Sequence, residues 1–318
     1  MGKIAFLYPG QGSQKVGMGR EMAEAAPDLF ARYMRRSNTV VGMPVTQYCL
    51  EGPFEALSQT HIAQPALFAH SLALTEYARQ LGLHPDMVAG HSLGEYTAAV
   101  AAGVLSFNEG LYLVSQRGKL MLHIQDEHPG AMAAVVGLAA DALHDLCVDI
   151  SHKHLVEVTN WNTHSQFVVS GLEAGVKALI EAAAGYKSVR AVRLATRGAF
   201  HSSLMAPVQA ALHEIMQHLT WHDAEVPLVA NVTGALLTHG QHIRQELISQ
   251  TTSPVQWVRC VETLMDAGCE TFVEIGASPV LTRLVRSIAP ESQVFTADTM
   301  ERVATITAIL RNTSAVCA

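Results

Sequence analysis

Residues 87–103 read Met87-Val-Ala-Gly-His-Ser-Leu-Gly-Glu-Tyr-Thr-Ala-Ala-Val-Ala-Ala-Gly103, and this stretch decides the fold class. It predicts a short buried strand over residues 87–89, a sharp turn over residues 90–94 and an alanine-rich helix that ends near Gly103. The turn satisfies G-x-S-x-G, in which a serine sits on a strained strand-to-helix turn with its hydroxyl exposed. Ser92 is therefore a candidate nucleophile on an α/β framework.

The flanking chain repeats the pattern of strand, turn and helix. Residues 3–8 form a continuous apolar run, typical of a buried parallel strand, and they end in the glycine-rich turn Pro9-Gly-Gln-Gly-Ser13. Apolar residues at helical spacing predict helices over residues 64–81 and 107–121. Strands over 226–232 and 271–275, and a helix between residues 254 and 267, continue the pattern. The sequence therefore predicts an α/β fold.

Between residues 131 and 194 the expected elements become shorter and follow a different order. We expect strand 132–136, helix 141–150, strand 156–160, strand 167–170, helix 173–184 and strand 189–194. This is the β-α-β-β-α-β order of ferredoxin-like domains. We therefore predict a discontinuous large domain, residues 1–127 and 198–318, that carries a small domain at residues 128–197.

Composition excludes several classes of protein. The chain has 318 residues, a formal charge of −7 and a hydrophobic fraction of 49%, which describes a well-cored globular protein. No block of cations is present, so we expect no nucleic-acid partner. The opening residues lack a signal-peptide core, and no apolar run reaches the roughly 18 residues of a membrane span, so we expect a cytoplasmic protein without a membrane partner. Isolated cysteines with no CxxC pair indicate a reducing compartment: Cys49, Cys147, Cys260, Cys269 and Cys317.

A nucleophilic serine needs a base, and the chain offers 16 histidines. Most lie in polar stretches, where a solvated histidine is the ordinary case. His213 and His218 are five residues apart on an expected helix, so they do not share a face as metal ligands at i and i+4 do, and we predict no metal site. His201 differs because it lies in Gly198-Ala-Phe-His201, just before a helix expected to begin near Ser202. The pattern alone favours His201 over its rivals without excluding them.

Seven motifs, in one order, give the chain a resemblance that runs almost from end to end. Together they resemble the malonyl-CoA:acyl-carrier-protein transacylase family. The resemblance implies an α/β-hydrolase-like large domain with an inserted ferredoxin-like small domain, which agrees with the division predicted above. It also implies no cofactor beyond the coenzyme A thioester substrate. The motifs are Gly10-Gln-Gly-Ser-Gln14, Gly90-His-Ser-Leu-Gly-Glu-Tyr96, Gln116-Arg-Gly118, Gly198-Ala-Phe-His201, Asn231-Val-Thr-Gly234, Pro254-Val-Gln-Trp257 and Gly276-Ala-Ser-Pro-Val-Leu281.

The resemblance assigns roles around the predicted nucleophile. Ser92 and His201 correspond to the catalytic dyad of the family, and the main-chain carbonyl at the position of Gln250 orients the histidine. The backbone N–H groups of Gln11 and Leu93 correspond to the oxyanion hole. A search for a triad aspartate between the dyad residues supports a dyad, because three of the four candidates fall in the expected small domain. Those candidates are Asp126, Asp141, Asp145 and Asp149.

The resemblance also predicts how the acyl group is recognised. Arg117 lies among apolar residues of an expected helix, and an inward-facing arginine must be paired. A surface arginine is the ordinary interpretation, whereas the resemblance implies a clamp for the free carboxylate of a malonyl group. Phe200 resembles the malonyl-selective version of its motif, whose bulk leaves little room for an α-methyl group. His164 stands where the family commonly has proline. The other implied substrate-binding residues are His91, Asn160, Asn162 and Gln166.

The resemblance implies a ping-pong acyl transfer by a protein that we expect to be a monomer. His201 takes the proton of Ser92, malonyl-CoA acylates the serine, and the phosphopantetheine thiol of an acyl carrier protein then accepts the malonyl group. Because such carriers are acidic, we expect a local basic face, with scattered solvated charges as the alternative. The candidate docking residues lie in a stretch without an acid: Lys187, Arg190, Arg193 and Arg197.

Two other classes of function fit parts of the pattern. An acyl hydrolase that clears carrier-bound acyl groups uses the same serine, but it does not need Arg117. A non-catalytic carrier-docking subunit does not need the Ser92 and His201 pair. A nucleotide-binding module needs a third glycine after Gly10-Gln-Gly12, where the chain has Lys15. The pathway of the acceptor carrier, fatty-acid synthesis or trans-acting polyketide synthesis, stays open.

Overall fold

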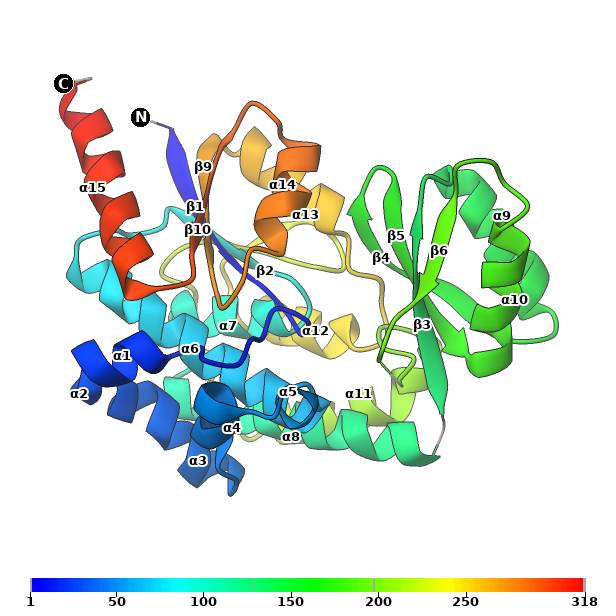
Figure 1. Cartoon of the computed structure of the whole chain (residues 1–318), viewed down its shortest axis with the longest axis horizontal. Coiled ribbons are helices and arrows are strands. Elements are labelled where there is room, and N and C mark those ends of the chain that lie inside the picture. The colour runs from blue at the N-terminus through cyan, green and yellow to red at the C-terminus, as the bar shows by residue number, and fades with distance from the viewer. Residues whose placement is uncertain (1, 128, 197, 317–318) are drawn as a thin grey trace.

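Two sheets organise the computed structural model, which describes residues 2–127, 129–196 and 198–316 (Figure 1). The strands of the larger sheet lie in the order β10-β9-β1-β2-β7-β8, and each neighbouring pair except β7 with β8 is parallel. The predicted α/β class is confirmed. The strands of this sheet are β1 (Lys3–Tyr8), β2 (Met87–Gly90), β7 (Leu228–Val229), β8 (Leu236–Leu237), β9 (Cys269–Ile275) and β10 (Gln293–Ala297).

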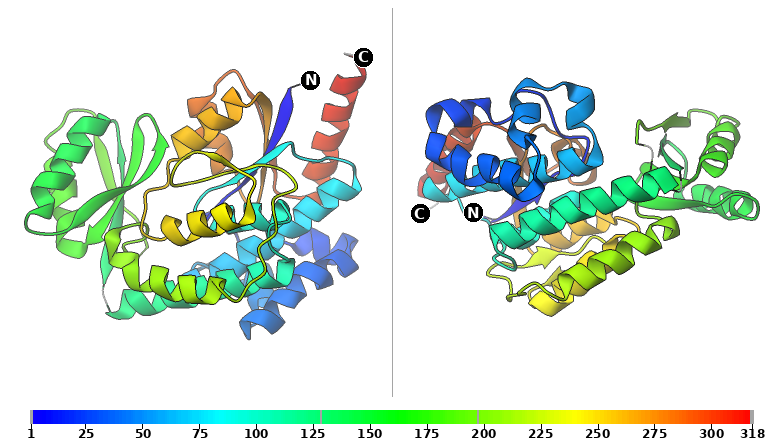
Figure 2. Two further views of the ribbon diagram at one scale, coloured as in Figure 1. Left: turned by 180° about the vertical axis from the view of Figure 1, so that it is seen from behind. Right: turned by 90° about the horizontal axis from the view of Figure 1, so that it is seen from below.

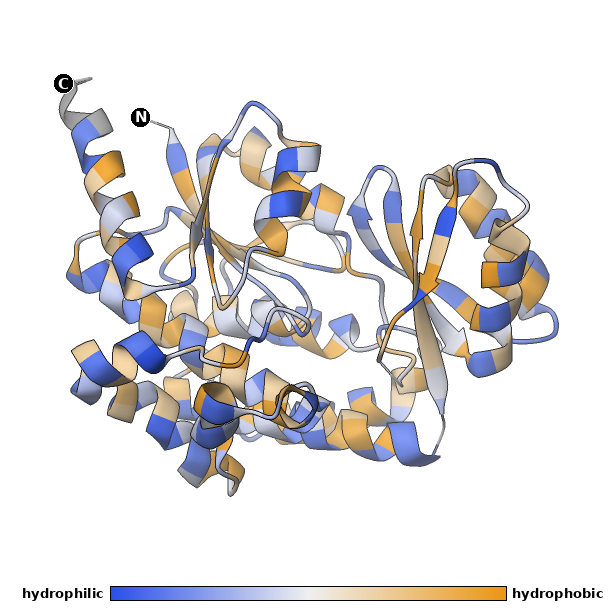
Figure 3. Cartoon of the chain, in the orientation of Figure 1, coloured by the Kyte–Doolittle hydropathy of each residue, from blue (hydrophilic) through white to orange (hydrophobic). Residues whose placement is uncertain are grey.

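Helices lie on both sides of the larger sheet (Figures 1 and 2). Phe6 and Tyr8 of β1 face one apolar core, and Ala5 and Leu7 face another, which explains why the strand is apolar on both faces after the exposed Lys3 (hydropathy along the chain is shown in Figure 3). Among the described residues, no helix combines the length and apolar character needed to span a membrane. The helices outside the smaller sheet are α1 (Arg20–Ala25), α2 (Pro27–Phe30), α3 (Arg36–Val41), α4 (Val45–Glu51), α5 (Phe54–Leu57), α6 (Thr60–Gln80), α7 (Leu93–Ala101), α8 (Phe107–Glu127), α11 (Ala206–Met216), α12 (Gly240–Gln250), α13 (Trp257–Asp266), α14 (Leu281–Ile288) and α15 (Met300–Val316).

The smaller sheet is antiparallel, has the strand order β4-β5-β3-β6 and encloses its own apolar core. A Cβ atom on Gly130, at its entry, would lie 2.7 Å from the Cβ atom of Ala199, so the chain enters and leaves this unit side by side. Backbone hydrogen bonds join β4 to Val255: Trp161 donates to the Val255 carbonyl at 2.8 Å, and Val255 donates to that of Thr159 at 2.9 Å. The elements, in the predicted order, are β3 (Gly130–Val136), α9 (Ala140–Ser151), β4 (Val156–Thr163), β5 (Gln166–Leu172), α10 (Glu173–Ala183) and β6 (Arg190–Arg193).

One expected strand is shorter in the structure than the sequence predicts. The strand expected over residues 226–232 contains only Leu228 and Val229, because the N–H groups that follow take other partners. Ala230 donates to the Ala235 carbonyl at 2.9 Å, and Asn231 donates to the Glu95 carboxylate at 3.0 Å. Tertiary partners therefore override the local pattern in this strand. The helix expected to begin near Ser202 does so: Ser202 is the N-cap of a 3-10 turn over Ser203–Met205, which continues into α11.

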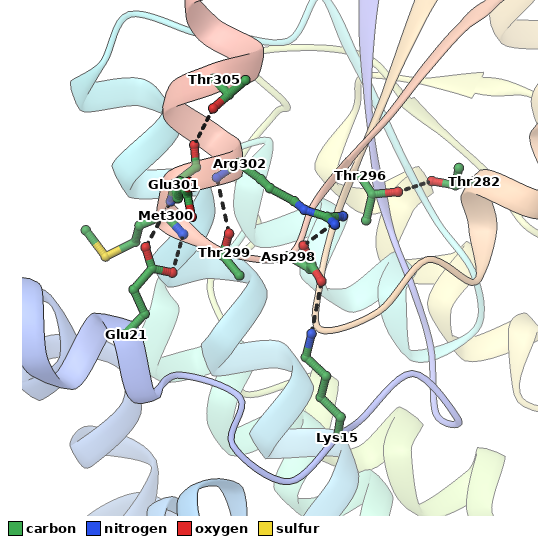
Figure 4. Close-up of polar contacts among 10 residues, drawn as sticks. All are labelled: Lys15, Glu21, Thr282, Thr296, Asp298, Thr299, Met300, Glu301, Arg302 and Thr305. Atoms are coloured by element: carbon green, nitrogen blue, oxygen red, sulfur yellow. Dashed lines mark hydrogen bonds and ion pairs between the residues drawn. The ribbon is translucent and has the colours of Figure 1, made fainter.

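The segment after the first glycine-rich turn is attached to the end of the chain (Figure 4). The Glu21 carboxylate accepts hydrogen bonds from the backbone N–H groups of Met300 and Glu301, both at 3.0 Å, and so caps α15. Lys15 Nζ lies 2.9 Å from the carboxylate of Asp298, which also contacts Arg302 at 3.3 Å. These contacts fix the start of the chain against the junction of β10 and α15.

The turn between β2 and α7 requires glycine on both sides of Ser92. A Cβ atom on Gly94 would lie 1.8 Å from the Tyr8 carbonyl oxygen, and one on Gly90 would lie 1.9 Å from the backbone of Gly94. Ser92 itself has a φ of 55°, a conformation that costs a non-glycine residue about 1–3 kcal/mol. The turn that follows β1 packs against it, because Gly10 lies close to the His91 carbonyl. Both turns therefore meet at the carboxyl edge of the sheet.

We expect Gly94→Ala to lower the free energy of unfolding by more than about 3 kcal/mol, because the new methyl group collides with the backbone of β1. Chemical denaturation measures the change. Gly185→Ala is the matched control: its Cβ atom would lie 3.3 Å from its nearest neighbour, the Ala182 carbonyl oxygen. Its effect should stay within about 1 kcal/mol. Equal losses in the two variants would show that close approach does not explain the glycine at position 94.

Candidate active site

A cavity of about 520 Å³ lies where the two glycine-rich turns meet the smaller sheet. It brings together residues that are far apart in the sequence, from the turn after β1 to the start of α14. Its size is typical of small-molecule sites. The predicted site residues that line it are Gln11, His91, Ser92, Leu93, Arg117, Asn160, Asn162, Gln166, Phe200 and His201.

Ser92 and His201 are in direct contact at this cavity. Ser92 Oγ lies 2.7 Å from His201 Nε2, and His201 Nδ1 lies 2.8 Å from the main-chain carbonyl oxygen of Gln250. Because a carbonyl only accepts, Nδ1 carries the proton, and the neutral ring presents an unprotonated Nε2 to the serine hydroxyl. Glu157 of β4 holds the next turn by accepting hydrogen bonds from the N–H and hydroxyl of Ser203, at 2.8 and 3.0 Å.

Leu93 and Gln11 line the cavity together with Ser92. Leu93 is the first residue of α7, so its backbone N–H has no acceptor within its own helix. Gln11 follows Gly10 in the turn that packs against the elbow, and both residues line the cavity. A helix N-terminus also favours a developing negative charge. The arrangement therefore suits an oxyanion formed at Ser92.

A buried carboxylate holds the elbow from behind. Glu95 accepts hydrogen bonds from the Asn231 backbone N–H at 3.0 Å and from Gln250 Nε2 at 2.6 Å. Asn231 Oδ1 in turn accepts from the Ser92 backbone N–H at 2.8 Å, and Gln250 Nε2 also donates to the Ser92 carbonyl at 2.9 Å. Both backbone groups of the strained serine are thus bonded to residues that Glu95 orients.

Glu95 has a second carboxylate beside it. Glu246 accepts from the Val232 backbone N–H at 2.6 Å. Burial raises the pKa of Glu95 well above its ordinary value, and the neighbouring Glu246 raises it further. Burial also raises the pKa of Glu246. Repulsion between neighbouring carboxylates disfavours the ionised form of Glu95.

Arg117 lies inside the protein, with 2% of its surface exposed. It donates to Gln64 Oε1 at 2.8 Å, to Gln250 Oε1 at 3.2 Å and to Ser92 Oγ at 3.3 Å, and its guanidinium lies 5.1 Å from the centre of the Tyr96 ring. Within the part of the chain that the structure describes, no carboxylate is in ion-pair contact with it. A buried cation with neutral partners next to the serine can bind an anionic group.

A chain of hydrogen bonds links Arg117 to the turn that carries Gln11. Because an arginine only donates, it fixes the Gln64 amide with Oε1 toward itself. Gln64 Nε2 then donates to the Thr60 hydroxyl at 2.8 Å, and that hydroxyl donates to Gln11 Oε1 at 2.9 Å. The anion-binding group and the predicted oxyanion donor are therefore oriented by two successive turns of α6.

The remaining predicted substrate residues also line the cavity. His91 Nε2 is 2.9 Å from Asn162 Oδ1, which joins the elbow to β4. Asn160 and Phe200 are buried, and Gln166 begins β5. His164 lies in the turn between β4 and β5, exposed and 3.8 Å from the Glu262 carboxylate of α13. The residue in the place of proline thus faces solvent and not the cavity.

The predicted docking residues are only partly free. Lys187 and Arg190 are exposed at the edge of the smaller sheet. Arg193, however, forms an ion pair with Glu173, whose carboxylate lies 2.7 Å from Nη2, so the absence of acids in the local sequence was misleading. Arg197 lies outside the described residues.

Sequence reasoning assigned no role to several residues that shape the site. Glu95 offered a signal, because it is the one acid in an alanine-rich helix that begins next to Ser92. Asn231 belongs to one of the seven motifs, but its partners Ser92 and Glu95 lie more than 130 residues away in the sequence. The sequence gives no indication of a role for Gln64 and Thr60. Their spacing of four residues places them on one face of a helix, but that face is functionally relevant only because Arg117 lies beside it.

Electrostatics keep His201 neutral. Burial, and next the positive charge of Arg117, lower the pKa of His201 to about 3. The hydrogen bond to the Gln250 carbonyl opposes this shift only in part. Burial likewise lowers the pKa of His91. His201 is therefore present as a base at neutral pH.

An elbow serine bonded to a neutral histidine, at the start of a helix and inside a cavity, is the arrangement of enzymes that transfer acyl groups through a serine. The chain belongs to the acyl transferase family: the sequence model of the family described as "Acyl transferase domain" matches residues 5–317.

Individual relatives are similar over almost their whole length. The chain is 39% identical over 289 residues to the malonyl CoA-acyl carrier protein transacylase of Bacillus subtilis, covering 91% of each protein. It is similar to the crystal structure of an acyl carrier protein S-malonyltransferase from Vibrio cholerae, with a TM-score of 0.90, 34% identity and coverage of 96% and 99%. It also matches the malonyl-transacylase in complex with a type II polyketide-synthase acyl-carrier protein, with a TM-score of 0.89, 33% identity and coverage of 97% and 99%.

The lowered pKa of His201 predicts a broad pH profile. Acylation of Ser92 by acetyl-CoA, whose acyl group has no carboxylate, should keep a constant rate from about pH 8 to about pH 5 and fall only in stronger acid. In Arg117→Ala the loss of a nearby positive charge raises the pKa of His201, so the acid limb should move to higher pH. Single-turnover acylation followed by intact mass measures both profiles. Identical acid limbs near pH 6.5 would contradict the electrostatic argument.

Glu95→Gln should slow acylation at least about tenfold while leaving the affinity for malonyl-CoA near the wild-type value. Glutamine offers one side-chain acceptor where two are used, so either the Asn231 N–H or the Gln250 amide loses its partner and the elbow loosens. Glu21→Gln is the control, because the Glu21 carboxylate also accepts from two N–H groups, but at the start of α15 and not at Ser92. A wild-type acylation rate in Glu95→Gln would exclude a positioning role for this carboxylate.

Proposed function

We propose that the protein transfers a malonyl group from coenzyme A to the phosphopantetheine thiol of an acyl carrier protein. The observation that carries this proposal is Arg117, a buried cation 3.3 Å from Ser92 Oγ whose direct partners are neutral. An acyl group with a free carboxylate can reach the guanidinium while its thioester carbon meets the serine. The named relatives support the same substrate and acceptor.

In the proposed mechanism the first half-reaction acylates Ser92. His201 Nε2 takes the hydroxyl proton as Oγ attacks the thioester carbon, and the N–H groups of Leu93 and Gln11 stabilise the oxyanion. When the intermediate collapses, the C–S bond breaks, and the thiolate of coenzyme A leaves with the proton from His201. The malonyl group is then held on Ser92 as an ester.

In the second half-reaction the carrier thiol replaces coenzyme A. His201 removes the thiol proton, the sulfur attacks the ester carbon, and Ser92 leaves with the proton returned from His201. The malonyl carboxylate offsets the charge of Arg117, so the pKa of His201 is higher in the acyl complex than in the free protein. A malonyl group therefore strengthens the base as well as binding to the cation, which an acetyl group does not do.

We further propose how the chain is organised for this reaction. Residues 128–197 act as a small domain beside the large domain formed by residues 1–127 and 198–318. The carrier approaches along the exposed cations Lys187 and Arg190. The proposal includes a cytoplasmic monomer that needs no cofactor. Carriers of fatty-acid synthesis and of trans-acting polyketide synthesis both present the required thiol.

Intact mass after incubation with malonyl-CoA tests the proposal. We expect a malonyl adduct on the wild-type protein, no adduct on Ser92→Ala, and quantitative transfer from the adduct to a holo carrier protein. The carboxylate clamp should favour malonyl over acetyl transfer about ten- to a hundredfold, from a charge-assisted bond worth about 1.5–3 kcal/mol. Arg117→Ala should lose this preference.

The same measurement separates transfer from hydrolysis. A hydrolase releases free malonate faster than the carrier can accept the group, and its rate does not depend on Arg117. Rapid release of malonate without a detectable adduct would overturn the proposed transfer and favour the alternative. An unchanged malonyl preference in Arg117→Ala would overturn the clamp alone.

A further inference from the structure

An aromatic side chain stands exposed at the mouth of the cavity. Phe54, the first residue of α5, lines the cavity and is 52% exposed. Of the described residues that line the cavity, the exposed ones are Gln11, Gly12, Phe54 and Ala195, and Phe54 alone among them has a large apolar side chain. An exposed phenylalanine leaves apolar surface in water, so it marks a place where a ligand can gain free energy by covering it.

The position of Phe54 relative to Arg117 and Ser92 determines which part of a bound thioester contacts it. Arg117, at 2% exposure, lies in the buried part of the cavity lining, and Ser92 lies next to it. A thioester that places its carboxylate at Arg117 and its carbonyl carbon at Ser92 must send its sulfur substituent toward the exposed rim. That substituent is the pantetheine arm, which is the same in coenzyme A and in a carrier protein.

Phe54 is held in place relative to the reacting atoms. Its helix ends next to Ser58, whose carbonyl accepts from Gln11 Nε2 at 3.4 Å and whose hydroxyl accepts from Gln14 Nε2 at 3.2 Å. The backbone N–H of Gln11 is also the predicted oxyanion donor, and Gln14 follows the same turn. The aromatic ring and the oxyanion site are therefore parts of one hydrogen-bonded unit.

We propose that Phe54 is a binding platform for the pantetheine arm and packs against its apolar dimethyl portion. This inference rests on the proposed malonyl transfer. A flat, rigid aromatic ring suits this role because it covers apolar surface at little cost in side-chain entropy. Since both substrates carry the same arm, Phe54 serves both half-reactions, whereas the nucleotide of coenzyme A and the surface of the carrier each serve only one.

Three malonyl thioesters of increasing length test the inference. Malonyl-N-acetylcysteamine lacks the dimethyl portion, malonyl-pantetheine has it, and malonyl-CoA adds the nucleotide. In Phe54→Ala we expect kcat/KM for Ser92 acylation to fall about tenfold with the two longer thioesters, equivalent to about 1.4 kcal/mol, and to stay unchanged with the shortest. Transfer to a holo carrier should fall by a similar factor. Phe54→Leu should retain most of the activity.

Tyr112→Ala is the matched control, because Tyr112 is an aromatic residue with 42% exposure on α8 that does not line the cavity. It should leave all three reactions unchanged. An equal loss of activity with all three thioesters would show that Phe54 acts through the structure of the site. A loss confined to malonyl-CoA would place Phe54 at the nucleotide, and a loss confined to the carrier would place it at the protein surface. Each of these three results, and equally the absence of any loss, overturns the inference.

The test also separates this inference from the proposed function. Acylation of wild-type Ser92 by malonyl-N-acetylcysteamine does not involve the proposed platform. If no thioester acylates the wild-type serine, the proposed function fails. If all three acylate it and Phe54→Ala behaves like wild type, only the platform is wrong.

Discussion

The strained turn at Ser92 is held by a carboxylate that never reaches the cavity. Glu95 accepts from Asn231 and Gln250, and those two residues bond the N–H and the carbonyl of Ser92. A serine with a φ of 55° keeps this conformation only where its surroundings over-determine it. Because the main chain of Gln250 also accepts the His201 hydrogen bond, one buried acid fixes Ser92 and His201 relative to each other. The remaining chemistry of the site depends on this arrangement.

A malonyl substrate would bring a negative charge next to the positive charge of Arg117. Arg117 has a full positive charge among amide, hydroxyl and aromatic partners, and it stands close to a histidine that burial already keeps neutral. A buried cation whose hydrogen-bond partners are all neutral is costly, and a carboxylate in direct contact with it lowers that cost. The site thus favours acyl groups that bring a negative charge of their own.

Local sequence was enough to predict the elbow and the succession of strands and helices that form the smaller sheet, because both follow from residues that are neighbours in the chain. The apolar run of β1 and the glycines around Ser92 act over a few residues. The Glu95 contacts with Asn231 and Gln250 join residues more than a hundred positions apart, and no local pattern encodes them. The same reason explains the shortened β7 and the pairing of Arg193 with Glu173. The contact of the Gln250 carbonyl with His201, and an inward-facing Arg117, were expected only through the resemblance to a family.

The smaller sheet begins and ends at one point, where Gly130 lies against Ala199. An inserted unit whose two ends touch can be exchanged for another without stretching or breaking the body that carries it. Its second attachment, between β4 and Val255, sets a limit on such exchange, since the register of β4 also positions Asn160 and Asn162 at the cavity. The fold therefore tolerates replacement of the smaller sheet: a new insert that keeps the edge of β4 can change the outer surface without altering the residues around Ser92.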